Sequence, residues 1–300
     1  MFLSTLNIGD YNVSGLNSTK IDSAKAMARN KTQNLPDLSA LLTPKNSLML
    51  AVERAVLRGQ DWASASAPIA EQIAARLAGV ITLDLVKSGQ RLLETDISEV
   101  LHVSRSPVRE AMRILERDRL VEFQSRRGAI VTSPDEHELR DIFHVRSVLY
   151  VTMLEQVARE NPAELEALLT AHLPKLVKAA DESADAYAVE SFLLNFATVG
   201  LCSNRLLVDL LHSISLRTLR YVRLGFVAEP RAIRTSLRDW RALQKAAIQR
   251  DNKRLLSLAI SRLDEARDTA IRAIAEKPAP GRRSRANKAT KSEAENIAAK

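Results

Sequence analysis

Three arginines stand four residues apart between Ser104 and Asp118, at Arg105, Arg109 and Arg113. The apolar residues of this stretch recur at i, i+3, i+4 and i+7, which predicts an amphipathic helix: Val108, Ala111, Met112 and Leu115. The three guanidinium groups then share its solvent face, where they can bind phosphates or the edges of bases. A basic stripe is more often an ordinary solvated face of a helix than a binding site. The neighbouring residues therefore have to distinguish these two interpretations.

The residues before this helix predict a helix-turn-helix. Ser104 or Ser106 can cap the arginine helix, and Pro107 falls in its first turn, where a missing N–H costs little. A shorter helical run over 96–101 precedes it across a tight His102-Val103 turn. In a helix-turn-helix the second helix enters the major groove of DNA.

The residues after the helix predict a β-hairpin wing. Two short strand-like runs, 120–123 and 130–132, flank the basic turn Gln124–Gly128, which contains Arg126 and Arg127. Each piece alone is weak, but the joint order of helix, turn, arginine helix, strand, basic tip and strand predicts DNA binding.

At these residues the chain resembles the GntR family of bacterial transcription regulators. The matching strings are Gly-Gln-Arg-Leu-Leu-Glu from Gly89, Val-Ser-Arg-Ser-Pro-Val-Arg-Glu-Ala from Val103, Leu120-Val121 and Arg127-Gly128. The resemblance implies that the arginine helix reads bases and that the wing tip enters the minor groove. We assign the DNA-binding site to Thr95, Ser104, Arg105, Ser106, Arg109, Arg113, Arg126, Arg127 and Gly128.

His102 and Arg119 depart from the family pattern, because relatives usually carry glycine at these two positions. We expect both residues in left-handed turns, at a cost on the order of 1 kcal/mol each.

The amino-acid composition limits the classes of protein to which this chain can belong. Among 300 residues 46% are hydrophobic and only nine are glycine, which favours a mostly α-helical chain of two domains plus tails. The formal net charge of +8 suits a polyanion, with a membrane surface as the competing partner. We see neither a transmembrane run nor a signal peptide, and the single cysteine, Cys202, allows no internal disulfide. We therefore expect a cytoplasmic protein with no membrane partner.

Four segments are expected. Residues 1–65 form a largely flexible extension with one helix near 47–58, unless translation begins at Met49. Residues 66–133 form the winged helix-turn-helix, of three helices plus the hairpin. Its first helix begins at Pro68 and should pack against Leu85, Leu92 and Ile97. Residues 134–276 form an all-α bundle, and residues 277–300 a disordered basic tail.

Residues 135–276 are helical in pattern throughout, with breaks near Asn161-Pro162, Asp181–Ser183, Gly200, Glu229-Pro230 and Arg250–Asn252. In a GntR-type chain this segment resembles the FadR C-terminal (FCD) domain, a bundle that binds small carboxylic acids, often through a metal. That resemblance implies an Asp, a His four residues later, and two His 22 residues apart. By spacing these ligands fall on Ser191, Asn195, Trp240 and Arg262. Because none is a good metal ligand, we predict that the metal site is lost and expect no cofactor.

The sequence leaves open what the interior of the bundle binds in place of a metal. We assign effector binding to Asn195, Trp240, Arg262 and Arg146, since an arginine fork pairs well with the carboxylate of a small acid. Alternatively, Trp240 fills the cavity and Arg262 pairs with an acid such as Glu190. A second basic stripe, Arg217, Arg220 and Arg223, is expected to be a solvated face.

Two functions fit these patterns. The first is a regulator, expected to be a repressor of a catabolic operon, that binds a palindromic operator as a homodimer and responds to a small, acidic metabolite. The alternative is a ligand-independent DNA-binding protein whose bundle serves only dimerisation. An enzyme is not expected, because the sequence lacks a glycine-rich phosphate loop, a paired carboxylate site and a Ser/His/Asp arrangement.

Overall fold

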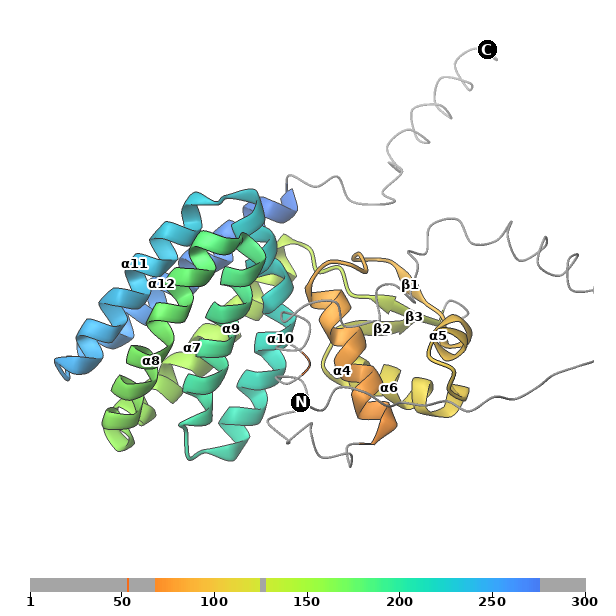
Figure 1. Cartoon of the computed structure of the whole chain (residues 1–300), viewed down its shortest axis with the longest axis horizontal. Coiled ribbons are helices and arrows are strands. Elements are labelled where there is room, and N and C mark those ends of the chain that lie inside the picture. The colour runs from red at the N-terminus through yellow and green to blue at the C-terminus, as the bar shows by residue number, and fades with distance from the viewer. Residues whose placement is uncertain (1–52, 54–67, 125–127, 276–300) are drawn as a thin grey trace, which may run out of the picture. The chain divides into compact units, whose positions relative to one another are not determined.

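A computed structural model describes residue 53, residues 68–124 and residues 128–275. They form helices with one small sheet, which confirms the predicted mostly α class with a winged helix-turn-helix and a helical bundle (Figure 1). Outside the described residues lie the remainder of the N-terminal extension, including most of the helix expected near 47–58, the wing-tip arginines Arg126 and Arg127, and the basic tail.

The winged part follows the predicted order. Its helices are α4 (Ile69–Thr82), α5 (Glu94–Val100) and α6 (Arg105–Arg117), and its strands are β1 (Arg91–Leu92), β2 (Val121–Gln124) and β3 (Gly128–Val131). The hairpin β2–β3 is antiparallel, with Val121 opposite Val131 and Gln124 opposite Gly128. The strand β1 was not expected; it pairs with the other edge of β3, giving the sheet order β1-β3-β2. Two residues are too short to show the alternation by which a strand is recognised.

The winged part has its core between α4 and α6. Ile73, Leu77 and Val80 of α4 are buried, as are Val108, Met112 and Leu115 of α6. Leu92 and Ile97 pack inside as expected, but the prediction for Leu85 is wrong. Leu85 is exposed and the next residue, Val86, is fully buried, because Asp84 has a positive φ of 57° that turns the chain after α4.

Two turns confirm the expectation drawn from the missing glycines. His102 and Arg119 have φ values of 52° and 57°, in the left-handed region. His102 ends the turn between α5 and α6, and Arg119 joins α6 to the wing, so both positions control where the arginine helix points.

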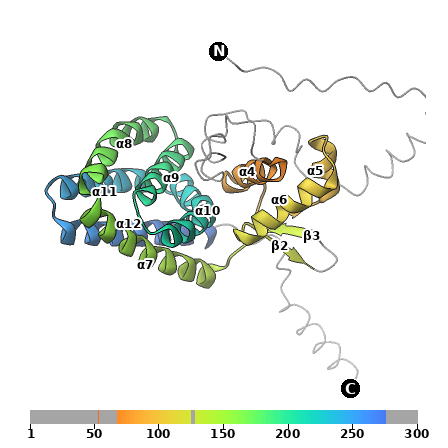
Figure 2. The same cartoon turned by 90° about the horizontal axis from the view of Figure 1, so that it is seen from below.

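The bundle has its helix boundaries at the predicted breaks. Its helices are α7 (Glu136–Glu160), α8 (Pro162–Glu182), α9 (Ala184–Gly200), α10 (Arg205–Ala228), α11 (Arg231–Ile248) and α12 (Asn252–Ala275). Side-chain caps fix four starts: Asp135, Ser183, Asn204 and Asp251 each accept a hydrogen bond from the backbone N–H three residues on. In Figure 2 the helices α8, α9 and α10 are seen nearly end-on. Within residues 68–124 and 128–275, no helix combines the length and the apolar character needed to cross a bilayer.

The second arginine stripe is not a solvated face, so that prediction is wrong. Arg220 is buried and pairs with Asp84 of the winged part, while Arg223 Nη2 donates to Asp185 at 3.0 Å. Arg217 lies 3.7 Å from Glu138. Periodicity predicted the shared face correctly, but it could not show that another part of the chain covers this face with acids.

The close approach of α10 to α12 depends on Gly225. A Cβ on this residue would lie 3.0 Å from Thr269 Cγ2 and 3.2 Å from the backbone nitrogen of Ala270. We expect Gly225→Ala to lower the free energy of unfolding by about 1–3 kcal/mol, because the backbone of α12 has to shift. Chemical denaturation measures this change.

Gly200→Ala is the matched control. Gly200 ends α9 and a Cβ added there would meet nothing within 4 Å, so alanine should be neutral or stabilising by up to about 1 kcal/mol. Equal effects of the two substitutions would show that helix propensity, not the contact with α12, decides the result.

Candidate DNA-binding surface and ligand cavity

The solvent face of α6 carries the predicted arginines. Arg105, Arg109 and Arg113 are exposed, while the apolar face of the same helix is buried. Ser104 stands at the N-cap, but its side chain accepts no capping hydrogen bond, so the expected capping role is wrong. Ser104 and Ser106 are both exposed at the start of the helix, which leaves their hydroxyls accessible to a phosphate.

Arg109 has a partner that the sequence did not indicate. Its Nη2 and Nε donate to the carboxylate of Glu94 at 3.0 and 3.2 Å. These hydrogen bonds and the charge of Glu94 raise the pKa of Arg109 above its ordinary value. Glu94 begins α5, so the pair joins the two helices of the helix-turn-helix and orients the guanidinium. The pair could not be found from periodicity, because its members are 15 residues apart.

Three elements bring further predicted residues together at the wing. Thr95 of α5, Arg105 of α6 and Gly128 of β3 line one surface depression, together with the exposed ring of Phe123. Gly128 has a φ of 77°, which favours glycine where the strand leaves the wing tip. The depression is lined by one arginine, Arg105, and one acid, Glu94, whose carboxylate is paired with Arg109. Phe123 was not among the predicted site residues.

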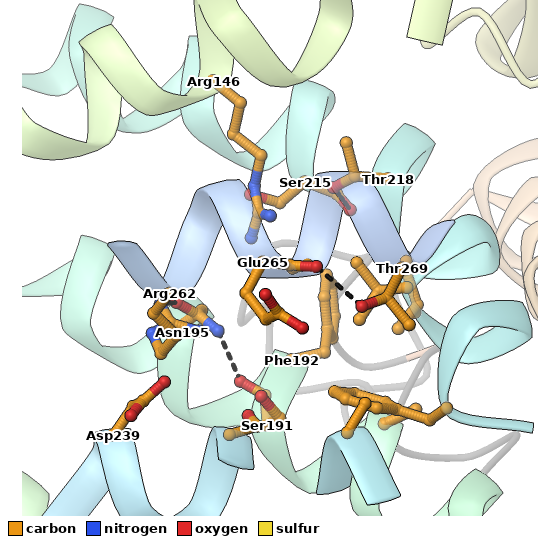
Figure 3. Close-up of a pocket in the computed structure, with 17 residues that line it drawn as sticks. Arg146, Ser191, Phe192, Asn195, Ser215, Thr218, Asp239, Arg262, Glu265 and Thr269 are labelled. Carbon is orange, nitrogen blue, oxygen red and sulfur yellow. Dashed lines mark hydrogen bonds between the residues drawn. The ribbon is translucent and has the colours of Figure 1, made fainter. Parts of the chain in front are cut away.

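In the bundle, the four positions assigned by metal-ligand spacing come together. Ser191, Asn195 and Arg262 line one small cavity (Figure 3). Trp240 lies beside them, with its ring centroid 4.1 Å from the guanidinium carbon of Arg262. The residues come from α9, α11 and α12.

These four side chains form one hydrogen-bonded network. Arg262 Nη2 donates to Asn195 Oδ1 at 2.8 Å, and Asn195 Nδ2 donates to the carbonyl oxygen of Ser191 at 2.7 Å. Trp240 Nε1 donates to Ser191 Oγ at 3.3 Å. The alternative in which Arg262 pairs with Glu190 is wrong, since its partner is a neutral amide and an aromatic ring.

The network does not suit the divalent metal that the family resemblance implies. The guanidinium of Arg262 repels a cation, the indole of Trp240 offers no lone pair, and neutral amide and hydroxyl oxygens bind such ions weakly. Throughout the part of the chain that the structure describes, no three His, Cys, Asp or Glu side chains gather in a metal-binding arrangement.

A second arginine enters the same cavity from α7. Arg146 is 5% exposed and Arg262 is 6% exposed. Burial, followed by the charge of Arg262, lowers the pKa of Arg146 to about 10, so the group stays protonated near neutral pH. Among the described residues neither guanidinium forms an ion pair with a carboxylate, and Arg146 Nε has no hydrogen-bond partner. Two buried charges of one sign without a counter-ion are costly, and an anion would relieve that cost.

The other polar residues that line the cavity were not predicted from the sequence. Besides Ser191, four hydroxyl side chains reach the cavity, from α10, α11 and α12: Ser215, Thr218, Ser236 and Thr269. Two carboxylates, Asp239 and Glu265, also line it. In the sequence these residues are isolated polar positions within otherwise apolar stripes, and only the packing of separate helices brings them together.

Two family profiles match the chain. The profile described as "Bacterial regulatory proteins, gntR family" matches residues 69–131, and the FCD domain profile matches residues 141–265. This chain belongs to the GntR family, in its FCD group. The first match spans the winged helix-turn-helix, and the second contains most of the helices that enclose the cavity.

Relatives of this GntR protein support the assignment. It is 32% identical over 133 residues to the uncharacterized HTH-type transcriptional regulator YdhC of Bacillus subtilis, covering 44% of this chain and 56% of that protein. It is 34% identical over 110 residues to the gluconate operon transcriptional repressor of Bacillus licheniformis, covering 37% and 44%. The chain thus spans about half the length of these curated relatives. The solved structure of E. coli McbR/YncC shares the fold at a TM-score of 0.62, with 17% identity and coverage of 69% and 99%.

Helix α10 of this GntR protein contacts both the cavity and the winged part. Ser215 and Thr218 line the cavity, while Ser213 Oγ donates to Asp118 at 3.3 Å and Arg220 pairs with Asp84. Asp118 is the C-cap residue of α6, the helix that carries the arginines. Lys87 Nζ also contacts Asp84, at 2.8 Å, and these partners hold the pKa of Asp84 below its ordinary value despite its burial.

The composition of the network predicts how the protein responds to metal removal. Purified protein should contain no stoichiometric zinc, nickel or manganese, and treatment with EDTA should leave its melting temperature unchanged, because the four residues cannot supply an anionic ligand set. Elemental analysis and calorimetry measure these two quantities. One metal ion per chain, lost on chelation together with stability, would contradict the prediction.

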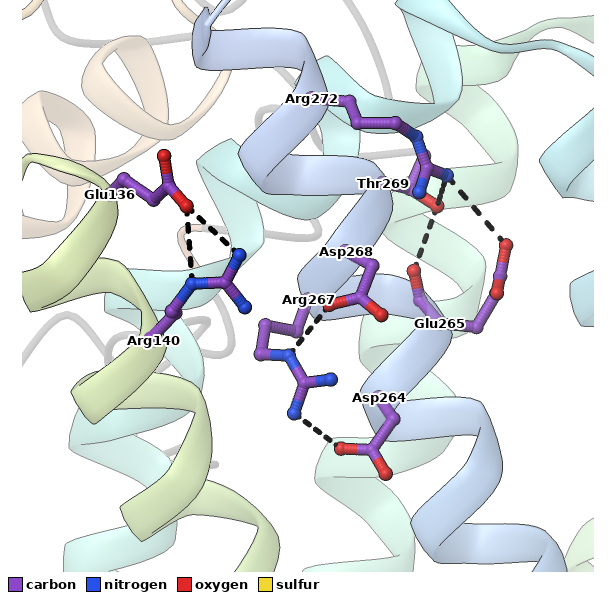
Figure 4. A network of polar contacts seen from close by, with 8 residues as sticks. All are labelled: Glu136, Arg140, Asp264, Glu265, Arg267, Asp268, Thr269 and Arg272. Atoms are coloured by element: carbon purple, nitrogen blue, oxygen red, sulfur yellow. Dashed lines mark hydrogen bonds and ion pairs between the residues drawn. The ribbon is translucent and has the colours of Figure 1, made fainter.

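The exposed face of α6 predicts the effect of removing one guanidinium. Arg109→Ala should weaken binding to a duplex selected from random sequences by about 1–3 kcal/mol and relax preference at one base step. The control is Arg140→Ala, which removes an exposed arginine of α7 that is paired with Glu136 at 2.9 Å (Figure 4). Unchanged affinity for Arg109→Ala in a gel-shift titration would disprove the readout role.

Proposed function

We propose that this GntR-family protein is a cytoplasmic transcription regulator that binds a palindromic operator as a homodimer, under the control of a small anionic metabolite. The metabolite is held directly by Arg146 and Arg262, without a metal. The observation that carries this proposal is the pair of buried guanidinium groups in one cavity, neither of which forms an ion pair with a carboxylate of the described residues. An anion supplies the missing charge and can accept hydrogen bonds from both groups.

DNA binding is supported by the exposed arginines of α6 and by the depression shared with the wing. A single winged helix-turn-helix reads few bases, so two copies on a two-fold symmetric site provide the specificity a regulator requires. The relative from Bacillus licheniformis is named as a repressor of the gluconate operon, which favours repression of a catabolic operon here as well.

Helix α10 provides the route between ligand and DNA in this proposal. A ligand that touches Ser215 and Thr218 acts on the helix that holds Asp84 and Asp118 from its other faces. Because Arg220 and Asp84 are both buried, a shift of α10 must either carry the winged part with it or break a buried ion pair. Breaking such a pair is costly, so the movement is transmitted.

Arg262→Gln tests the proposed function. The wild-type protein should change its affinity for a selected operator when small carboxylates are added, by the roughly 5- to 150-fold typical of allosteric coupling of about 1–3 kcal/mol. Arg262→Gln should abolish this response and leave the ligand-free DNA affinity unchanged, since the residue lies far from α6 in the chain and inside the bundle. Fluorescence anisotropy with labelled duplex measures both quantities.

Arg267→Gln is the matched control. Arg267 lies on the same helix, α12, but pairs with Asp264 at 2.6 Å and Asp268 at 2.8 Å outside the cavity (Figure 4). The Arg267→Gln variant should respond to carboxylates like the wild type.

In the same titration Asp84→Asn should reduce the effect of the ligand on DNA affinity, while the affinity for the ligand itself persists. A wild-type protein indifferent to every carboxylate would favour the ligand-independent alternative, in which the bundle serves only dimerisation.

A further inference from the structure

The charged groups that line the cavity are balanced in number but separated in space. Arg146 and Arg262 are buried, whereas the Asp239 side chain is 16% exposed and that of Glu265 is 49% exposed. Figure 3 shows Arg146 entering from α7 and Asp239 from α11, on opposite sides of the cavity. Among the described residues no ion pair joins the two arginines to the two acids. The cavity therefore presents a buried positive region and a more accessible negative region.

The two carboxylates have arginine partners that do not line the cavity. Asp239 accepts from Arg238 Nη2 at 3.2 Å, and Glu265 lies 3.9 Å from Arg272. Arg238 is largely exposed and Arg272 about half exposed, and such surface pairs contribute little because water screens them. Asp239 and Glu265 thus keep lone pairs for a cation inside the cavity.

We propose that the ligand is an amino-carboxylate: its carboxylate binds Arg146 and Arg262, and its ammonium group binds Asp239 and Glu265. This inference rests on the proposed function and names the class of metabolite. A purely anionic acid would satisfy the arginines and leave the acids unused, and a dicarboxylate would meet repulsion at Asp239 and Glu265. Phe192, Leu219 and Val222 provide an apolar wall against which the carbon chain of the ligand can lie.

Matched pairs of ligands test the class. The probes are 4-aminobutyrate against 4-hydroxybutyrate, and L-alanine against L-lactate, because each pair differs only in exchanging an ammonium group for a hydroxyl. Titration calorimetry with the full chain should show tighter binding of the amino member of at least one pair, on the order of tenfold, as expected for a charge-assisted hydrogen bond.

The double variant Asp239→Asn with Glu265→Gln should remove this preference, so that the amino acid and the hydroxy acid of each pair bind equally. The control Asp264→Asn removes a carboxylate of α12 that pairs with Arg267 instead of lining the cavity, and it should keep the preference (Figure 4). Circular dichroism melting confirms that each variant is folded before titration.

The outcomes separate this inference from the proposed function. Arg262-dependent binding of the hydroxy acids that equals or exceeds that of the amino acids overturns the amino-carboxylate class but keeps the proposed function. A preference for the amine that survives in the double variant also overturns the assignment of Asp239 and Glu265. If no member of either pair binds, the inference fails. Should the wider carboxylate titration of operator affinity also show no response, the proposed function fails with it.

Discussion

Helix α10 makes three contacts at once, with α12, with the cavity and with the winged part. The rest of the structure depends on these contacts. One face packs so closely against α12 that a Cβ on Gly225 would lie 3.0 Å from Thr269 Cγ2. A second face supplies Ser215 and Thr218 to the cavity, and a third places Arg220 against Asp84. Because one rigid helix carries all three contacts, the packing of the bundle, the shape of the cavity and the contact with the winged part cannot change independently.

The cavity owes its chemistry to two buried arginines that form no ion pair with the acids of the same cavity. Trp240 and Asn195 stabilise the guanidinium of Arg262 through its face and one of its hydrogens. Among the described residues Arg146 has neither an aromatic ring nor an amide as such a partner. Its pKa is lowered to about 10 by burial and by the charge of Arg262. A site of this kind gains more from an anionic ligand than a neutral pocket does, because ligand binding removes an electrostatic cost that the folded chain already bears.

The four residues at the metal positions of the FCD pattern form a coherent set. Here Ser191, Asn195, Trp240 and Arg262 hydrogen-bond and stack with one another. The guanidinium lies among the positions that the pattern assigns to metal ligands, and like a metal ion it offers positive charge to a carboxylate. Unlike a metal, it carries this charge without anionic ligands from the protein.

The sequence alone was sufficient for the fold class, the helix boundaries in the bundle and the arginine face of α6. These features are local: apolar periodicity, capping residues such as Asp135, and breaks such as Asn161-Pro162 act within a few residues of one another. The left-handed turns at His102 and Arg119 were also predictable, from the positions where relatives carry glycine.

Tertiary structure alone decided which charged residues are partners. The pairs Arg109–Glu94 and Arg220–Asp84, the closeness of Arg146 to Arg262, and the burial of Val86 in place of Leu85 all join residues that local pattern does not relate. The stripe containing Arg217 and Arg220 shows the reason. A helical period tells which side chains share a face, but whether that face meets water, an acid or an empty cavity depends on which other element folds against it.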